Sequence, residues 1–150
     1  MRRMIILLSG ILAITLGWAN LSYAQIGQAI AEGEQKAAAG DIKGALSVYE
    51  TLTQTHPDSH QAHARLGGMQ LLEQRYSDAV KSFQRAISLG DQGTGTFIGM
   101  GMAYLHMGQL GPARAALVEA RSRGVANPGD VDQIIAWIDK RQPGKGPAHP

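Results

Sequence analysis

The stretch TGTFIGMGMAYLHMGQLGPARAALVEARSRGVAN, residues 94–127, decides the fold of this 150-residue chain. Its apolar residues recur with helical spacing over residues 97–106 and again over residues 110–122, and a short break containing Gly108 separates the two segments. Small residues stand where two antiparallel helices would touch: Gly101, Ala113 and Ala120. Because such surfaces let two backbones approach closely, the stretch predicts a helical hairpin.

The same pattern occurs three times, at a spacing of 34 residues. One shift toward the N-terminus brings similar residues into the slots of residues 101, 113, 117 and 120: Gly67, Ala79, Phe83 and Ala86. A second shift brings in Gly33, Ala45 and Tyr49. Three contiguous units without insertions therefore cover residues 26–59, 60–93 and 94–127.

A period of this length, built as helix–turn–helix, resembles the tetratricopeptide repeat family. The clearest match lies in the second unit: Leu66, Gly67, Tyr76, Ala79, Phe83 and Ala86. No unit carries the family's early Trp, and its slot holds other residues: Ala29, His63 and Phe97. The resemblance implies an all-α fold, a right-handed α-solenoid of three helical hairpins.

Turn and cap residues divide these units into helices. The predicted helices cover residues 26–38, 42–53, 60–72, 76–89, 97–106 and 110–122. Gly40 and Asp41 end one helix and start the next, and Pro57 closes the first unit. An amphipathic helix over residues 130–141 is predicted to cap the last repeat, with Trp137 buried against it. The Pro- and Gly-rich tail, residues 142–150, is predicted to be disordered.

The N-terminal residues, 1–24, have the features of a secretory signal peptide. Arg2 and Arg3 precede an apolar run over residues 4–18, and Ser22 and Ala24 supply the small residues of a cleavage site. Cleavage after Ala24 would place a mature domain, residues 25–141, in the periplasm or outside the cell. The alternative is an uncleaved membrane anchor, but the apolar run is shorter than the roughly 20 residues of a spanning helix.

Composition narrows the classes of partner. Without Arg2 and Arg3, the fourteen Lys and Arg of the chain fall to twelve, which equals the number of Asp and Glu. A neutral domain without a basic stripe has no electrostatic footprint for nucleic acid, and membrane contact is expected only through an uncleaved leader. The chain has no Cys, so disulfides and thiol-linked haem are excluded and packing alone must hold the domain.

In the family that the chain resembles, the first helix of each hairpin lines a concave groove. Transferring these slots, and adding one further glycine, gives the predicted partner-binding groove: Ile30, Glu34, Ala64, Gly68, Leu71, Ile98, Gly99, Met102 and Leu105. This surface is apolar, small and nearly uncharged. Family members that grip a C-terminal carboxylate use Lys, Arg and Asn in these slots. Arg65 is the nearest such residue here, so a carboxylate clamp is not expected.

Two glycines of this set motivate a binding hypothesis. Close packing within a hairpin explains Gly67 and Gly101, but it does not explain Gly68 and Gly99. A glycine inside a helix costs about 1 kcal/mol relative to Ala. Such a cost is understandable if the backbone of a partner must come close, so an apolar partner segment is predicted to lie along the groove. The alternative explanations are tight packing between hairpins and drift in a tolerant scaffold.

The remaining candidates for chemistry are weaker. His56, His60 and His63 are closely spaced and could bind a metal, but Asp58 is the single nearby carboxylate and the set is incomplete. No nucleophile constellation and no Gly-rich loop after a strand is present, so no catalytic residue and no cofactor is predicted.

The sequence therefore predicts a non-catalytic protein–protein interaction module of the bacterial periplasm or cell envelope. It would hold an apolar segment of another envelope or exported protein, as an assembly factor for an envelope or cytochrome complex. Two alternatives stay open. One is a homo-oligomeric structural scaffold formed by self-association, and the other is a metal-binding protein that uses His56, His60 and His63.

Overall fold

The computed structural model describes residues 23–141, and these residues form helices and no strand. The first helix covers residues 23–38. The others are α2 (Ile42–Thr55), α3 (His60–Leu72), α4 (Tyr76–Ser88), α5 (Thr94–His106), α6 (Leu110–Ser122) and α7 (Pro128–Arg141). Most of the predicted signal peptide and the whole predicted tail lie outside the described residues. No helix in the described part of the chain is both long enough and apolar enough to cross a membrane.

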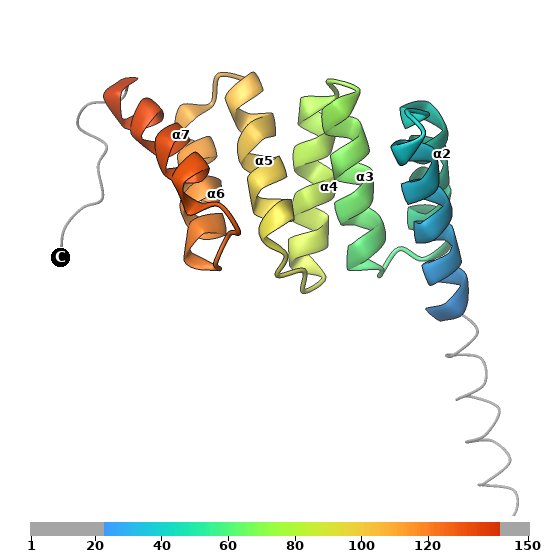
Figure 1. Ribbon diagram of the computed structural model, residues 1–150. Helices are drawn as coiled ribbons and strands as arrows, with labels where there is room; N and C mark the ends of the chain where they lie inside the picture. The colour runs from blue at the N-terminus through green and yellow to red at the C-terminus, as the bar shows by residue number, and fades with distance from the viewer. Residues whose placement is uncertain (1–22, 142–150) are drawn as a thin grey trace, which may run out of the picture.

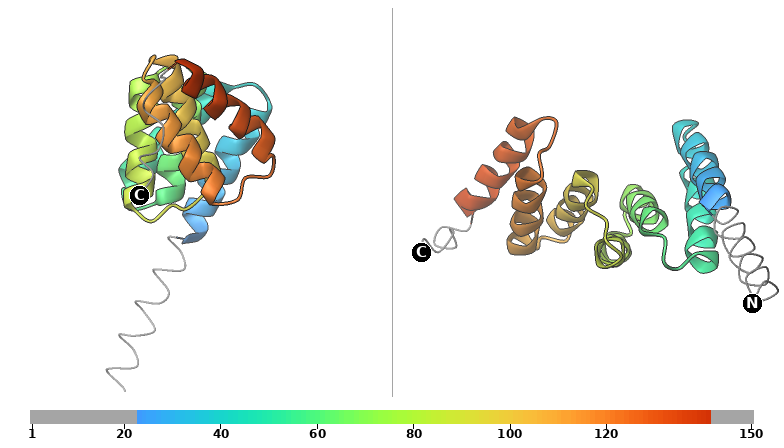
Figure 2. Two further views of the ribbon diagram at one scale, coloured as in Figure 1. Left: turned by 90° about the vertical axis from the view of Figure 1, so that its left-hand side faces the viewer. Right: turned by 90° about the horizontal axis from the view of Figure 1, so that it is seen from below.

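The helices stack as hairpins in chain order, from the first helix to α7 (Figure 1). Figure 2 shows, from below, a shallow arc in which the first helix, α3, α5 and α7 line the inner side. Helices α2, α4 and α6 form the outer layer. The predicted all-α solenoid of three helical hairpins with a terminal helix is confirmed, and the predicted bounds of α3 and α6 match the observed ones.

Large side chains fill the space that the repeated glycines leave. The ring of Phe83 lies over Gly67, where an added Cβ atom would come within 2.8 Å of it, and Leu117 lies over Gly101 at 2.9 Å. Tyr49 covers Gly33 in the same way, and its hydroxyl donates a hydrogen bond of 3.3 Å to the carbonyl of Ile30. Burial raises the pKa of the Tyr49 hydroxyl. The predicted close approach of paired helices is therefore present in all three hairpins.

The turns follow the cap chemistry of their residues. The side chain of Asp41 accepts a hydrogen bond of 2.9 Å from the amide of Gly44, which caps α2. Gly40 and Gly108 end the first helix of their hairpins with φ of +82° and +70°. The same slot of the second hairpin holds Gln74, with φ of +60°. A side chain in this left-handed conformation is strained, so the middle turn is built from an unfavourable residue.

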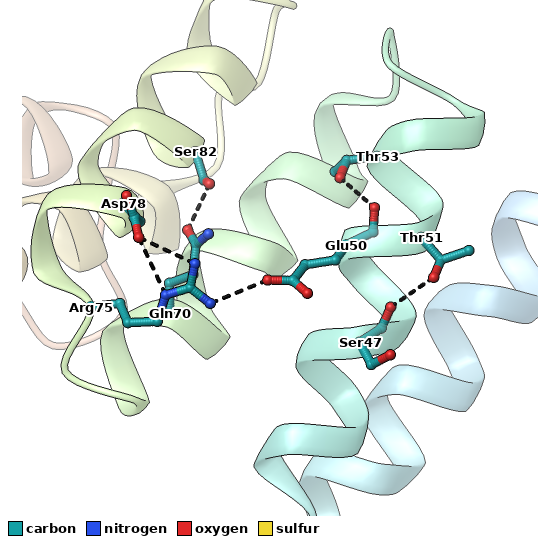
Figure 3. A network of polar contacts seen from close by, with 8 residues as sticks. All are labelled: Ser47, Glu50, Thr51, Thr53, Gln70, Arg75, Asp78 and Ser82. Atoms are coloured by element: carbon teal, nitrogen blue, oxygen red, sulfur yellow. Dashed lines mark hydrogen bonds and ion pairs between the residues drawn. The ribbon is translucent and has the colours of Figure 1, made fainter.

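Polar contacts join the first hairpin to the second (Figure 3). Arg75, just before α4, donates from Nη1 to Glu50 of α2 at 3.2 Å and from Nη2 to Asp78 at 3.2 Å. Deeper in the second hairpin, the buried hydroxyl of Ser82 donates to the side-chain oxygen of Gln70 at 2.7 Å. The ion pairs of Arg75 are exposed to water, so they contribute little to the free energy of unfolding.

Helix α7 packs on α6 through Val131 and Ile138, which are both buried. Two ion pairs hold it there: Arg114 with Asp139, at 2.5 Å, and Arg121 with Asp132. The hydrogen bond from Arg114 lowers the pKa of Asp139. The prediction that Trp137 would be buried is wrong, because its side chain is 44% exposed and Arg141 lies over its ring at 3.7 Å.

Candidate functional site

The inner side of the arc carries the surface that the sequence predicts as a groove. Its middle is built from very small residues of α3, and an added Cβ atom at Gly68 would meet nothing within 4 Å. Leu72, at the end of the same helix, is 59% exposed. Toward the N-terminal end, Glu34 and Arg65 form an ion pair of 2.5 Å between the first helix and α3. The negative charge of Glu34 in this region is therefore balanced by the positive charge of Arg65.

The two glycines that motivated the binding hypothesis differ in their surroundings. Gly68 faces open space, as the hypothesis requires. Gly99 does not, because an added Cβ atom there would lie 2.5 Å from Cζ of Phe83, on the neighbouring hairpin. Gly99 is therefore explained by packing between hairpins, and its placement in the binding surface is corrected.

Several other predicted groove residues are partly buried in the core, so that only part of each side chain faces the inner side. Ile30 packs partly against the core cluster around Tyr49, and Leu71 against the cluster around Phe83. Ile98 and Leu105 pack partly against the cluster around Leu117. Ala64 and Met102 are half-buried. The free apolar surface is thus narrower than the sequence predicts.

A pocket of about 560 Å³ lies at the C-terminal end of the inner side, between α5 and α7. We name it the cap pocket, and its lining residues are Met102, Leu105, Asp130, Gln133, Ile134 and Trp137. Met102 and Leu105 belong to the predicted groove. The four residues from α7 were missed, because the terminal helix was expected to be only a lid on the core.

The repeat register explains why this pocket is open. Helix α3 contacts α5, whereas no Cα atom of α7 lies within 8 Å of α5. In the 34-residue register, Gln133 and Trp137 of α7 are equivalent to Gly99 and Ala103 of α5. Large side chains in these slots prevent close approach of the helices, and both line the pocket. The large residues Gln133 and Trp137, at positions where the preceding unit has Gly and Ala, are the sequence signal that could have revealed the cap pocket.

The three histidines are not brought together by the fold. His63 makes a contact of 3.1 Å between Nε2 and the carbonyl of Pro57, and His56 contacts the hydroxyl of Thr55. The Nδ1 atom of His60 lies 3.6 Å from a carboxylate oxygen of Asp91. Over residues 23–141, no group of three or more His, Cys, Asp or Glu side chains is placed to hold a metal ion. The geometry gives no support to the metal-binding alternative.

A second apolar depression, of about 490 Å³, lies between α4 and α6 and is floored by Phe97, Met100 and Tyr104 of α5. A third, between the first helix and α2, is lined largely by Gln, Ser and Thr side chains. Neither depression is lined by residues of the predicted groove, so the groove and the cap pocket together are the candidate site.

Comparisons with known proteins agree with this architecture. Residues 30–94 match the family model described as tetratricopeptide repeat. No curated protein sequence matches the chain. The type III secretion translocator chaperone SycD of Yersinia enterocolitica is similar in structure, with a TM-score of 0.74 at 14% identity over 80% of this chain and 87% of that chain.

Two further solved structures are similar to this chain. PcrH, in complex with the chaperone-binding region of PopD, has a TM-score of 0.73 at 15% identity, over 80% of this chain and 95% of that chain. The TPR2B domain of yeast Sti1, in complex with pHsp70, has a TM-score of 0.72 at 15% identity, over 79% of this chain and 98% of that chain. At such low identity the likeness shows the fold.

Stacked helical hairpins with an open inner surface define the chain as a helical-repeat protein of the kind that binds other proteins. The family match over residues 30–94 and the fold of the described residues support a tetratricopeptide repeat protein. Proteins with this fold are typically non-catalytic modules for protein–protein interaction.

Proposed function

We propose that this protein holds an apolar segment of an exported or envelope protein in its concave groove. The observation that carries the proposal is the apolar surface that α3 and α5 expose on the inner side. It consists of the open space over Gly68, the exposed Leu72, and Met102 and Leu105 at the cap pocket. Exposed apolar surface gathered on one concave face is typical of a protein-binding site.

The charges of the groove favour an uncharged ligand. Glu34 and Arg65 pair with each other, so a bound segment would meet little net charge along the first helix and α3. Arg65 is also occupied by that pair, which argues against recognition of a C-terminal carboxylate. Met102 adds a flexible apolar side chain that can adapt to a ligand.

The test is a groove variant with Gly68→Leu and Met102→Glu. Because an added Cβ at Gly68 meets nothing, this variant should keep its helix content in circular dichroism while its groove is filled and charged. The matched control makes the same changes on the outer layer, Gly111→Leu and Val118→Glu; a Cβ at Gly111 also meets open space and Val118 is exposed. Partner capture from an envelope extract should be lost in the groove variant and kept in the control. A folded groove variant that captures the same proteins would refute the proposal.

The cellular location is part of the same proposal and rests on the leader alone. N-terminal sequencing of the protein from a periplasmic fraction should begin at Gln25, which follows the predicted cleavage site. Recovery of the chain with its leader, in the cytoplasmic fraction, would contradict export.

We further propose that the protein acts as an assembly factor for an envelope complex. A factor that shields an apolar segment should be needed while its partner is unassembled. Deleting the gene should therefore lower the amount of the partner complex, and the groove variant should not restore it. Normal assembly of every captured partner in the deletion strain would remove this role.

A further inference from the structure

The cap pocket allows the ligand to be described more closely. We propose that it receives one large apolar side chain of the bound protein segment, and that a Lys or Arg beside this side chain pairs with Asp130. The inference rests on the proposed groove function and adds the chemistry of the anchoring residue. The pocket is lined by residues from two helices, Met102 and Leu105 of α5 and four residues of α7.

The size of the pocket suits a large anchor. At about 560 Å³, within the range common for ligand pockets, it has room for a large side chain together with neighbouring atoms of the bound segment. Its walls are the side chains of Met102, Leu105, Ile134 and Trp137. An aromatic or long aliphatic side chain placed there would contact apolar atoms of both helices.

The pocket stays open because α7 is held from its other side. Helix α7 packs on α6 through the buried Val131 and Ile138, and its Asp139 and Asp132 pair with Arg114 and Arg121 of α6. Gln133 and Trp137 then stand between α7 and α5. A pocket maintained in this way is present before a ligand arrives, which lowers the ordering cost of binding.

The charge of Asp130 at the rim of the cap pocket favours a basic residue next to the anchoring side chain of the ligand. Within residues 23–141, Asp132 and Asp139 each pair with an arginine, whereas Asp130 has no ion-pair partner. Arg141, which lies over Trp137, is eleven residues further along α7, about 16 Å from Asp130 at 1.5 Å per residue. The rim is therefore acidic at the Asp130 end, and a basic residue of the ligand is complementary to it.

The experiment uses an array of twelve-residue peptides on an Ala, Gln and Gly background. Each peptide carries one anchor, Phe, Leu or Ser, and one flanking Lys, Glu or Gln at varied spacing. The array is probed with the full chain carrying Trp18→Phe, in which Trp137 is the single Trp and reports pocket occupancy by its emission. Peptides with Phe or Leu beside Lys should bind and shift the emission to the blue, and Ser in place of the anchor should weaken binding about tenfold or more.

Two variants test the two parts of the inference. Ile134→Glu should abolish binding of every anchored peptide. Asp130→Lys should change the preferred flanking residue from Lys to Glu, while Lys140→Glu, an exposed position on α7 outside the pocket lining, should leave the preference unchanged. An unchanged preference in Asp130→Lys, or an array with no binding peptide, overturns the inference.

The remaining outcomes separate this inference from the proposed function and from other occupants. If partner capture is lost in the groove variant but kept in Ile134→Glu and Asp130→Lys, the groove function stands and the cap pocket is not the anchor site. If the emission of Trp137 shifts on deletion of residues 142–150, the chain's own tail is the occupant and the inference is wrong. An emission shift that follows protein concentration, with a dimer in light scattering, identifies a second copy and also overturns it.

Discussion

The junction between the second and third hairpins and the junction between the third hairpin and α7 use the same repeat slots in opposite ways. At the first junction, the Phe83 ring of α4 sits between Gly67 and Gly99, and Ala103 is fully buried. At the second, Gln133 and Trp137 occupy the slots of Gly99 and Ala103, and α7 stands away from α5. The first junction is closed by apolar packing, whereas at the second α7 packs on α6 through Val131 and Ile138 and leaves a pocket open toward α5.

This difference teaches that the size of two side chains decides whether a repeat junction becomes core or binding surface. Small residues let the next helix seal the junction, because its backbone can reach the large side chain opposite. Large residues at the same slots hold the helices apart and leave apolar surface exposed. The stability of the solenoid should therefore reside in the closed junction, and its selectivity in the open one.

The largest expected effect separates the two aromatic residues of these junctions. Phe83→Ala should lower the free energy of unfolding by about 3–5 kcal/mol, because Phe83 is 3% exposed and its removal leaves a cavity between two glycines. Trp137→Ala should change it by about 1 kcal/mol or less, since nearly half of the side chain is already in water. Urea denaturation followed by circular dichroism measures both. Equal losses would contradict the division between closed and open junctions.

The next effect compares the two glycines that the sequence treats alike. Gly99→Ala should destabilise the fold by about 1–3 kcal/mol, because the Phe83 ring is confined by Gly67 on its other side and cannot yield. Gly68→Ala should instead stabilise it by up to about 1 kcal/mol, since the new methyl group meets nothing and Ala favours the helix. The shift in the urea midpoint gives the sign directly. A stabilising Gly99→Ala would show that the closed junction has spare room.

The smallest effect concerns the ion pairs behind the open junction. Arg114 lowers the pKa of Asp139, so this pair stabilises the docked α7 above the ordinary carboxyl pKa of 3.8 and the contribution is lost as the pH falls through the lower folded value. The difference in Tm between the parent chain and Asp139→Asn should be small and positive at pH 7 and vanish in acid. Asp58→Asn, at an exposed carboxylate, serves as the control and should show no such pH dependence. A difference that grows toward low pH would refute the assignment.

The sequence predicts the closed parts of the molecule well. Gly67, Gly101 and the buried alanines of the hairpins follow from a strict 34-residue register, which fixes both the helix bounds and the facing surfaces. Local cap chemistry at Gly40 and Asp41 confirms the turn of the first hairpin. These features depend on neighbours within one hairpin, so pattern and propensity are sufficient to locate them.

The sequence predicts the open parts less well. The prediction of a buried Trp137 is wrong because its burial depends on how α7 packs on α6 through Val131 and Ile138. Gly99 was placed in the binding surface because contacts between hairpins are not visible in a single unit. Gln74 in a left-handed turn gives no residue-type signal at all, and only its register with Gly40 and Gly108 marks it. In each case the missing information is the geometry between units.

The order of contacts along α2 to α7 has a consequence for how the chain acquires its structure. Each of these helices touches the helix that follows it, and the one longer link joins α3 to α5. No distant segment must be found before a hairpin is complete, so folding should be rapid and should proceed in the order of synthesis. A polypeptide that is still being made can thus finish its earliest repeats first, and damage near α7 should leave those repeats intact.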